Sequence, residues 1–272
     1  MKPDWQLTHQ GEPMAAIDAL AAISQLPKAR LKDAMNKGAV WLKRGKKMQR
    51  LRRATFMLQV GDHLQLFYNA DLLARTAPAS TLFADEKAYS VWYKPAGVLA
   101  QGNEYGDHCA LLRQAEQQLQ RQVFLVHRLD REAEGLMLIA HTGKAAAQLS
   151  NLFQQQQIEK YYRIEVRGEL PEQGTFERKL DGKPAKTIYQ RLQFDSQLNR
   201  SIVDVRIEHG RKHQIRRHFA DAGFPILGDP RYGQNNADPR GMQLVAYRLK
   251  FVCPLTKKSR DYHWPLPSAN QD

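Results

Sequence analysis

The chain has 272 residues, of which 42% are hydrophobic and 25% charged, a composition typical of folded rather than disordered proteins. The length suits a catalytic domain of ~200 residues with a small second domain. No apolar run approaches the ~20 residues of a membrane span, and the first residues lack the apolar stretch of a signal peptide. The two cysteines, Cys109 and Cys253, lie far apart in the sequence. We therefore expect a cytoplasmic protein with reduced thiols, without membrane association, a disulfide framework or a four-thiolate zinc site.

Positive charge is the most informative property. The 41 Lys and Arg exceed the 28 Asp and Glu by 13. Between Lys28 and Arg53 stand eleven basic residues and a single acid, Asp33. This excess predicts a polyanionic partner, and nucleic acid is favoured over a membrane because the charge does not follow a strongly apolar helix. A basic protein without such a partner is the alternative.

The first 75 residues predict two helices followed by strands. We expect a polar, poorly ordered lead-in over residues 1–15, helices over 16–22 and 31–36, and strands over 40–43, 53–60 and 63–68. Gly61 and Asp62 are typical of a hairpin turn. Residues 75–80, rich in Ala, Thr, Pro and Ser, are predicted to be a linker. The predicted domains are therefore 1–75 and 82–272.

The second domain is predicted to be rich in strands. We expect strands over 89–93, 123–126, 136–140, 161–166, 187–192, 202–207 and 244–251, and helices over 110–120 and 144–154. The pattern indicates an α+β domain built on a mixed sheet.

A loop between two of these strands carries a candidate catalytic carboxylate. Asp130 stands between Arg128 and Arg131 within residues 127–135, and a neighbouring guanidinium would keep it ionised and oriented. Such a carboxylate can act as nucleophile or base. The alternative is an ion-paired loop residue with a structural role only.

Residues 210–223 predict a basic helix that ends at Gly223. Ile215 and Phe219 recur at helical spacing and would face the core, whereas Arg216 lies on another face from which it could enter a pocket. The alternative is a solvated basic face that touches phosphates nonspecifically. A zinc site at His209 and His213 is not expected, because Gly210 interrupts the helix, no zincin carboxylate follows, and the neighbouring cations repel a metal ion.

Two adjacent tyrosines begin another predicted strand. Because strand side chains alternate, one of Tyr161 and Tyr162 should face inward and the other outward. Ordinary core packing would explain them, and a stacking role would require a flipped base.

Together, five segments resemble the RluA-type family of RNA pseudouridine synthases. The matching motifs are Lys94-Pro95-Ala96-Gly97, His127-Arg128-Leu129-Asp130, the strand from Lys160 to Gly168, the helix from Gly210 to His218, and the turn from Gly223 to Gly233 that contains Gly228-Asp229 and Tyr232-Gly233. The resemblance covers about Leu82 to the C-terminus. Ala133, Glu134 and Phe224 depart from residues common in relatives. More weakly, the N-terminal unit resembles an S4-type RNA-binding domain.

The resemblance implies a pseudouridine synthase fold of α+β class, with a mixed, mainly antiparallel sheet and a small S4-like N-terminal domain. It implies an isomerase that cleaves the N1–C1′ bond of uridine and joins C5 to C1′ without metal or cofactor. Asp130 is the catalytic carboxylate, whether by attack on C1′ or by removal of the C2′ proton. Arg216 pairs with Asp130, and Tyr162 stacks on the flipped base and assists deprotonation at C5.

The resemblance also implies an RNA substrate and residues that bind it. Ribosomal RNA of the large subunit is favoured and transfer RNA comes next, and a monomer is expected. The predicted substrate-binding residues are His127, Arg128, Lys94, Arg211, His213 and Gln214. The predicted RNA-binding surface of the N-terminal unit consists of Arg30, Lys32, Lys43, Arg44, Lys46 and Lys47.

Two other functions compete with this one. A nucleoside hydrolase or glycosidase could use Asp130 with Glu132 or Glu134 as acid and base, and it would release uracil instead of leaving base and sugar joined. A noncatalytic RNA-binding or ribosome-assembly protein could retain the fold. Such a binder would keep its phenotype when Asp130 is replaced by Asn.

Overall fold

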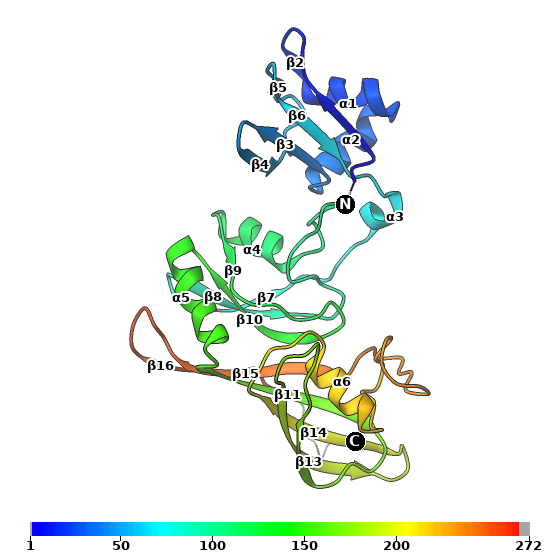
Figure 1. The fold of residues 1–272 in the computed structure, drawn as a ribbon, viewed down its shortest axis with the longest axis vertical. Coiled ribbons are helices and arrows are strands. Elements are labelled where there is room, and N and C mark those ends of the chain that lie inside the picture. Colours follow the sequence, from blue (N-terminus) through cyan, green and yellow to red (C-terminus); the bar gives the residue numbers. More distant parts are fainter. Residues whose placement is uncertain (1, 267–272) are drawn as a thin grey trace. The chain divides into compact units, whose positions relative to one another are not determined.

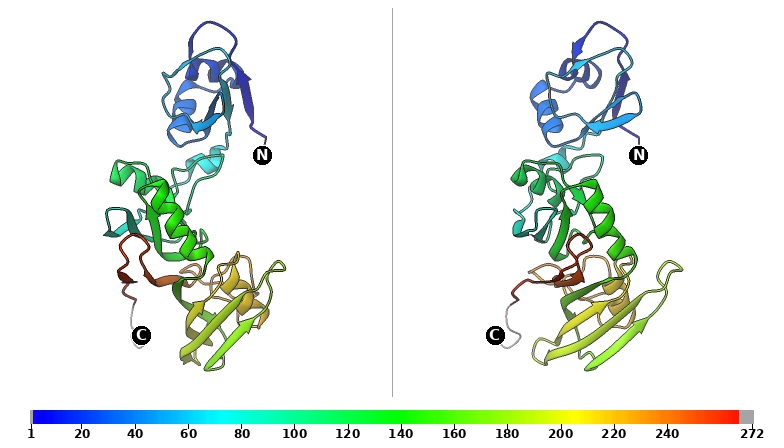
Figure 2. Two further views of the ribbon diagram at one scale, coloured as in Figure 1. Left: turned by 60° about the vertical axis from the view of Figure 1, so that its left-hand side comes forward. Right: turned by 90° about the vertical axis from the view of Figure 1, so that its left-hand side faces the viewer.

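The computed structural model describes residues 2–266, which form two compact units (Figures 1 and 2). The first unit comprises residues 2–77 and 101–114, and the second comprises 78–100 and the chain from 115 onward. The first crossing lies inside the predicted linker, 75–80. The assignment of 101–114 was not anticipated, because the predicted boundaries place this segment in the second domain.

The first unit is a small α/β structure. Its elements are β1 (Trp5–Thr8), β2 (Met14–Ala15), α1 (Ala16–Ser24), α2 (Lys28–Asn36), β3 (Val40–Arg44), β4 (Lys47–Arg50), β5 (Met57–Leu58), β6 (His63–Leu66) and α3 (Ala70–Ala74). A four-stranded sheet has the order β1-β6-β3-β4, and β2 pairs with β5. The apolar faces of α1 and α2 contribute Leu20 and Leu31 to a core with Leu64 of β6.

Two predictions for this unit were wrong. Residues 5–8 are not a disordered lead-in but strand β1, which pairs antiparallel with β6 from Trp5 to Thr8. Of the residues 53–60 that were expected to form a strand, only Met57–Leu58 do so, and they pair with β2. In both cases the pairing partner, distant in sequence, decides whether the backbone is extended.

The segment 101–114 is bound to the first unit by specific polar contacts. The Asp107 carboxylate lies 2.5 Å from Nη2 of Arg52 and 3.2 Å from Nε of Arg50. The indole N–H of Trp41 donates to the carbonyl of Glu104 at 3.1 Å. Part of the basic run of the first unit is therefore used within the unit itself.

The second unit contains a ten-stranded sheet. Its strands are β7 (Thr81–Asp85), β8 (Tyr89–Lys94), β9 (Phe124–Leu125), β10 (Glu134–Ala140), β11 (Ile158–Arg167), β12 (Gln173–Glu177), β13 (Lys186–Asp195), β14 (Arg200–Ile207), β15 (Leu244–Val252) and β16 (Ser259–His263). The main order is β12-β13-β14-β11-β15-β10-β8-β7, with β16 on β15 and β9 on β10. The seven predicted strands are all present, and β7, β12 and β16 were not foreseen.

Three helices accompany the sheet. They are α4 (Leu111–Leu119), α5 (Gly143–Gln154) and α6 (Gln214–Asp221). The boundary between the two units falls within α4. Helix α5 contacts β9 and β10, and α6 contacts β13 (Figure 1). The second unit is thus an α+β domain with a mixed and mainly antiparallel sheet, as predicted.

The only parallel pairing of the described sheet positions the candidate site. Strands β10 and β15 pair over just two residues, Glu134 with Val245 and Gly135 with Ala246. Gly135 has φ +123°, and a Cβ there would lie 2.3 Å from the carbonyl oxygen of Ala246. Glycine is needed because the two backbones meet here. The loop that carries Asp130 enters the sheet at this point.

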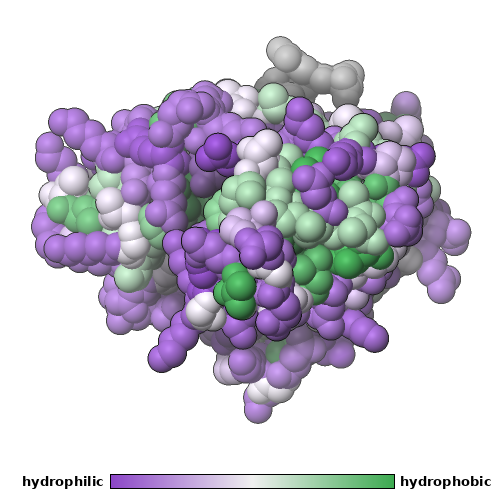
Figure 3. All heavy atoms as spheres, turned by 90° about the horizontal axis from the view of Figure 1, so that it is seen from above, coloured by the Kyte–Doolittle hydropathy of each residue, from purple (hydrophilic) through white to green (hydrophobic). Residues whose placement is uncertain are grey.

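The surface is mainly polar. Viewed from above the orientation of Figure 1, hydrophilic residues cover most of the visible face, and a hydrophobic area lies among them (Figure 3). Between residues 2 and 266, no helix is both long and apolar enough to cross a membrane.

Candidate active site

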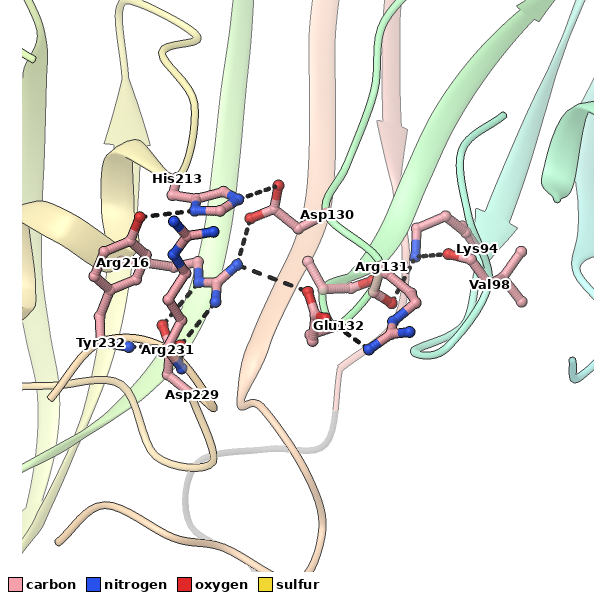
Figure 4. Close-up of polar contacts among 11 residues, drawn as sticks. Lys94, Val98, Asp130, Arg131, Glu132, His213, Arg216, Asp229, Arg231 and Tyr232 are labelled. Carbon is pink, nitrogen blue, oxygen red and sulfur yellow. Dashed lines mark hydrogen bonds and ion pairs between the residues drawn. The ribbon is translucent and has the colours of Figure 1, made fainter. Parts of the chain in front are cut away.

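Asp130 lies in the loop between β9 and β10 and is held from two sides (Figure 4). Nη1 of Arg216 donates to one carboxylate oxygen at 2.9 Å. Nε2 of His213 lies 3.5 Å from the other oxygen. The Asp130 side chain keeps 24% of its surface exposed. The carboxylate is therefore oriented by its neighbours and still accessible to a substrate.

Arg216 is a buried bridge between two carboxylates. Its side chain is 2% exposed, and its Nε and Nη2 each donate to Asp229 at 2.7 Å while Nη1 reaches Asp130. Burial alone would lower the pKa of Arg216, but the hydrogen bonds to Asp229 and Asp130 outweigh it and raise this pKa. The guanidinium group is therefore permanently charged and held rigidly, so it can orient the Asp130 carboxylate.

Asp229 anchors this arginine from the turn that follows α6. Its carboxylate also accepts hydrogen bonds from the backbone N–H groups of Arg231 and Tyr232, at 2.8 and 3.1 Å. Burial opposes ionisation of Asp229, yet the hydrogen bonds from Arg216 and the backbone keep its pKa below the ordinary value. Asp229 thus stays charged at neutral pH and fixes the direction of Arg216.

His213 connects the same turn to Asp130. It adopts a left-handed conformation, φ +54°, at the N-cap of α6. Its Nδ1 lies 2.9 Å from the hydroxyl of Tyr232, so the imidazole spans the distance between Tyr232 and Asp130. Burial, first among several causes, lowers the pKa of His213. A neutral imidazole at this position is well placed to donate Nε2–H to the carboxylate.

A cavity opens in front of Asp130, and Tyr162 forms part of its wall. Arg128, His213, Arg216 and Leu244 also line it. As predicted, the two tyrosines alternate: Tyr162 is 8% exposed, whereas Tyr161 is less buried and donates to Glu159 at 2.5 Å. Burial and then the charge of Asp130 raise the pKa of Tyr162. The phenol is therefore neutral at neutral pH.

Lys94, which was predicted to bind substrate, has its ammonium group enclosed by backbone carbonyls. It is fully buried at the end of β8, and its ammonium group donates to the carbonyls of Pro95, Val98, Arg131 and Ala133, at 3.1, 2.9, 3.5 and 2.6 Å. Figure 4 shows Val98 and Arg131 beside Lys94. Burial lowers the pKa of Lys94 to about 8. Two of the four carbonyls belong to the loop of Asp130, so Lys94 holds the shape of that loop.

Two other predicted binding residues also have internal partners. The amide group of Gln214, 3% exposed, donates to Lys186 and Thr187, while its oxygen accepts from the N–H of Arg211. Nε2 of His127 accepts the backbone N–H of Leu138 at 2.9 Å. Both residues also line cavities, Gln214 the one in front of Asp130 and His127 a neighbouring one. Arg128 and Arg211 both line the cavity walls.

The six residues of the predicted RNA-binding surface are all exposed: Arg30, Lys32, Lys43, Arg44, Lys46 and Lys47. Arg44 differs from the others because it forms a two-point ion pair with the buried carboxylate of Asp62, at 2.5 and 2.7 Å. This pairing reduces the charge that Arg44 presents to solvent.

Asp229 and Tyr232 were absent from the predicted site residues. Both stand in the Gly-Asp-x-x-Tyr-Gly turn that the sequence analysis singled out. The signal was therefore present as a motif, but no spacing rule linked this turn to Arg216. Within residues 2–266, no group of three or more His, Cys, Asp or Glu side chains is arranged to hold a metal ion.

Comparison with known proteins identifies the class. Residues 88–221 match the RNA pseudouridylate synthase family. Two human structures, RNA pseudouridylate synthase domain containing 4 and 1, share the fold, with TM-scores of 0.57 and 0.61 at 23% and 20% identity. They cover 69% and 71% of this chain, and 89% and 86% of their own chains.

Sequence relatives agree with this assignment. The chain is 35% identical over 164 residues to an uncharacterized RNA pseudouridine synthase of Chloroflexus aurantiacus, covering 54% of this chain and 51% of the relative. It is 30% identical over 223 residues to ribosomal large subunit pseudouridine synthase D of Nitrosomonas europaea, covering 71% and 64%. It is 28% identical over 201 residues to tRNA pseudouridine synthase C of Vibrio parahaemolyticus, covering 61% and 81%.

Residues 88–221, most of which lie in the second unit, therefore form an RNA pseudouridylate synthase domain. Members of that family are isomerases acting on uridines in RNA. The chain spans about half to two thirds of the length of the first two relatives.

Proposed function

We propose that this protein is an RNA pseudouridine synthase that isomerises particular uridines in structured RNA. The observation that carries the proposal is the Asp130 carboxylate, fixed by Arg216 and open to a cavity walled by Tyr162. Large-subunit ribosomal RNA is the favoured substrate, because relatives named for it match 64–71% of this chain. Transfer RNA comes next.

The proposed reaction requires no co-reactant other than water. The N1–C1′ bond breaks, the base turns, C5 bonds to C1′, the proton at C5 passes to water, and N1 takes a proton from water. Asp130 supplies the carboxylate, either as nucleophile at C1′ or as base at C2′, and Arg216 orients it by a hydrogen bond of 2.9 Å. Tyr162 stacks on the base, which must leave the RNA stack at a cost of a few kcal/mol.

The first unit supplies RNA affinity in this proposal. Its exposed lysines attract the phosphate backbone without reading sequence. We propose an S4-like role for this unit, based on the order of α1, α2 and β3 and on the basic surface that follows them. A cytosolic location and a monomeric state are parts of the same proposal.

Tritium release tests the chemistry directly. RNA transcripts of large-subunit ribosomal RNA, carrying tritium at C5 of uridine, are incubated with the purified protein and with Asp130→Asn. The wild type should release tritium, and the variant should bind the RNA without release. Release of free uracil would instead identify a hydrolase, and no release from ribosomal or transfer RNA would contradict the proposal.

A further inference from the structure

The second unit buries two lysines whose surroundings differ. Lys94 is fully buried and donates to four carbonyl groups. Lys160, on β11, is 5% exposed, and among the described residues its ammonium group has one hydrogen-bond acceptor, the carbonyl of Glu208 at 3.2 Å. A buried ammonium ion with a single protein acceptor is costly, because the burial of a charge is offset only by pairing and hydrogen bonding. The fold of the unit does not explain this cost.

Lys160 borders a second cavity, of about 360 Å³, whose wall contains other cationic side chains. Arg128 and Arg211 line it, together with His127 and His209. None of the described lining residues is acidic. Two carboxylates that adjoin lining residues in sequence have other partners: Glu159 accepts from the hydroxyl of Tyr161 at 2.5 Å, and Glu208 lies 3.9 Å from the ammonium group of Lys186. An anion entering this cavity would meet positive charge from three long side chains.

This second cavity adjoins the one in front of Asp130. The two share Arg128, Tyr162, Ile207, Gly210 and Arg211 as lining residues. Tyr162 and Lys160 are two positions apart on β11, so both side chains point to the same face of the strand. A chain of nucleotides whose uridine enters the first cavity would therefore pass the second.

We propose that the cavity lined by Lys160, Arg128 and Arg211 binds a phosphate group of the RNA next to the target uridine. This inference rests on the proposed function. Lys160 supplies a point charge with two N–H donors available, and the two arginines supply planar donors at the cavity wall. Holding the flanking phosphate here fixes the backbone on one side of the flipped nucleotide, so the uridine is oriented before the reaction begins.

The test compares Lys160→Met with two other variants. Lys160→Arg keeps the charge, and Lys258→Met removes one from an exposed position that lines neither cavity. Binding of fluorescent oligouridylate is measured by anisotropy over a range of salt concentrations, and thermal unfolding is measured for every variant. Tritium release under single-turnover conditions is recorded separately on ribosomal RNA transcripts.

Lys160→Met should bind oligouridylate roughly tenfold more weakly at low salt, and the plot of log Kd against log salt should be shallower by about 0.7, the value for one phosphate on a single strand. Its melting temperature should equal or exceed that of the wild type, because an apolar side chain replaces an under-bonded charge. Lys160→Arg should restore the slope, and Lys258→Met should leave binding within about twofold.

Two results would overturn the inference. One is a wild-type salt slope in Lys160→Met; the other is a clear fall in its melting temperature, which would give Lys160 a structural role like that of Lys94. Neither measurement depends on turnover. Failure of the wild type to release tritium would contradict the proposed function alone, whereas normal release with an unchanged slope would contradict this inference alone.

Discussion

The basic residues of the two units are used in opposite ways. In the first unit Lys43, Lys46 and Lys47 are exposed and free to follow a phosphate backbone. In the second unit Arg216 is 2% exposed and each of its polar nitrogens is directed at a carboxylate. Net charge predicts only the first use, in which exposed basic side chains attract phosphate. The second depends on which acids the fold brings to the same place.

Replacing Arg216 should have the largest effect. In Arg216→Lys, a single ammonium group cannot bond both oxygens of Asp229 and one oxygen of Asp130 at once. Buried carboxylate oxygens therefore lose their donors. We expect a fall of about 3 kcal/mol in the free energy of unfolding, as for a broken buried ion pair. The single-turnover rate should fall at least ~100-fold through misorientation of Asp130. Urea denaturation and tritium release measure the two quantities.

Arg217→Lys is the matched control, because Arg217 neighbours Arg216 but pairs with the exposed Asp181 at 3.0 Å. It should keep activity and stability close to wild type. An active Arg216→Lys would show that Asp130 needs no rigid partner and would remove the main contrast between the units.

Asp229→Asn should have the next largest effect, and the effect should depend on pH. The pKa of Asp229 is lowered in the folded state, so its charge stabilises the protein above the ordinary carboxyl pKa of about 3.9. That contribution is lost as the pH falls through the lower folded pKa. At neutral pH the free energy of unfolding of the variant should be about 2 kcal/mol lower than that of the wild type. Below pH 4 it should fall less steeply with pH than that of the wild type. Denaturation across pH 2–7 tests this, with the exposed Asp221→Asn as control.

Asp107→Ala should destabilise the first unit moderately. It removes the carboxylate shared by Arg50 and Arg52, whose side chains are 16% and 24% exposed, and should cost about 1–2 kcal/mol. Asp33→Ala breaks an exposed i,i+4 pair with Lys37 and should cost less than ~0.5 kcal/mol. Equal effects in calorimetry would show that 101–114 contributes nothing to the stability of this unit.

Neutralising the exposed lysines should affect binding alone. With Lys43, Lys46 and Lys47 all changed to Gln, the plot of log Kd against log salt should become shallower by about 2, because each phosphate contact contributes ~0.7–0.9. Stability and the single-turnover rate at saturating RNA should be unchanged. An unaltered salt slope would show that this surface does not contact RNA.

The sequence predicted the elements that carry their own pattern. Residues 161–166 and 202–207 alternate in polarity and are strands, and the loop of Asp130 lies between two strands as expected. The pairing of Arg216 with Asp130 was implied by the family resemblance, and the structure places the two side chains in contact. The motifs thus indicated the carboxylate that Arg216 contacts.

What the sequence could not supply depends on long-range contacts. Trp5–Thr8 is a strand because β6 pairs with it, and 101–114 joins the first unit because Asp107 meets Arg50 and Arg52. Lys94 was expected at the substrate, but nothing local reveals that four carbonyl groups surround its ammonium group. The role of Asp229 was hidden for the same reason.

Mapping of pseudouridines across total RNA tests the central claim most directly. Carbodiimide labelling and sequencing would compare cells with the gene, cells without it, and deleted cells that express Asp130→Asn. The account predicts one or a few sites, in ribosomal or transfer RNA, that disappear in the deletion and return with the wild-type gene but not with the Asn variant. Return of those sites with Asp130→Asn would contradict it.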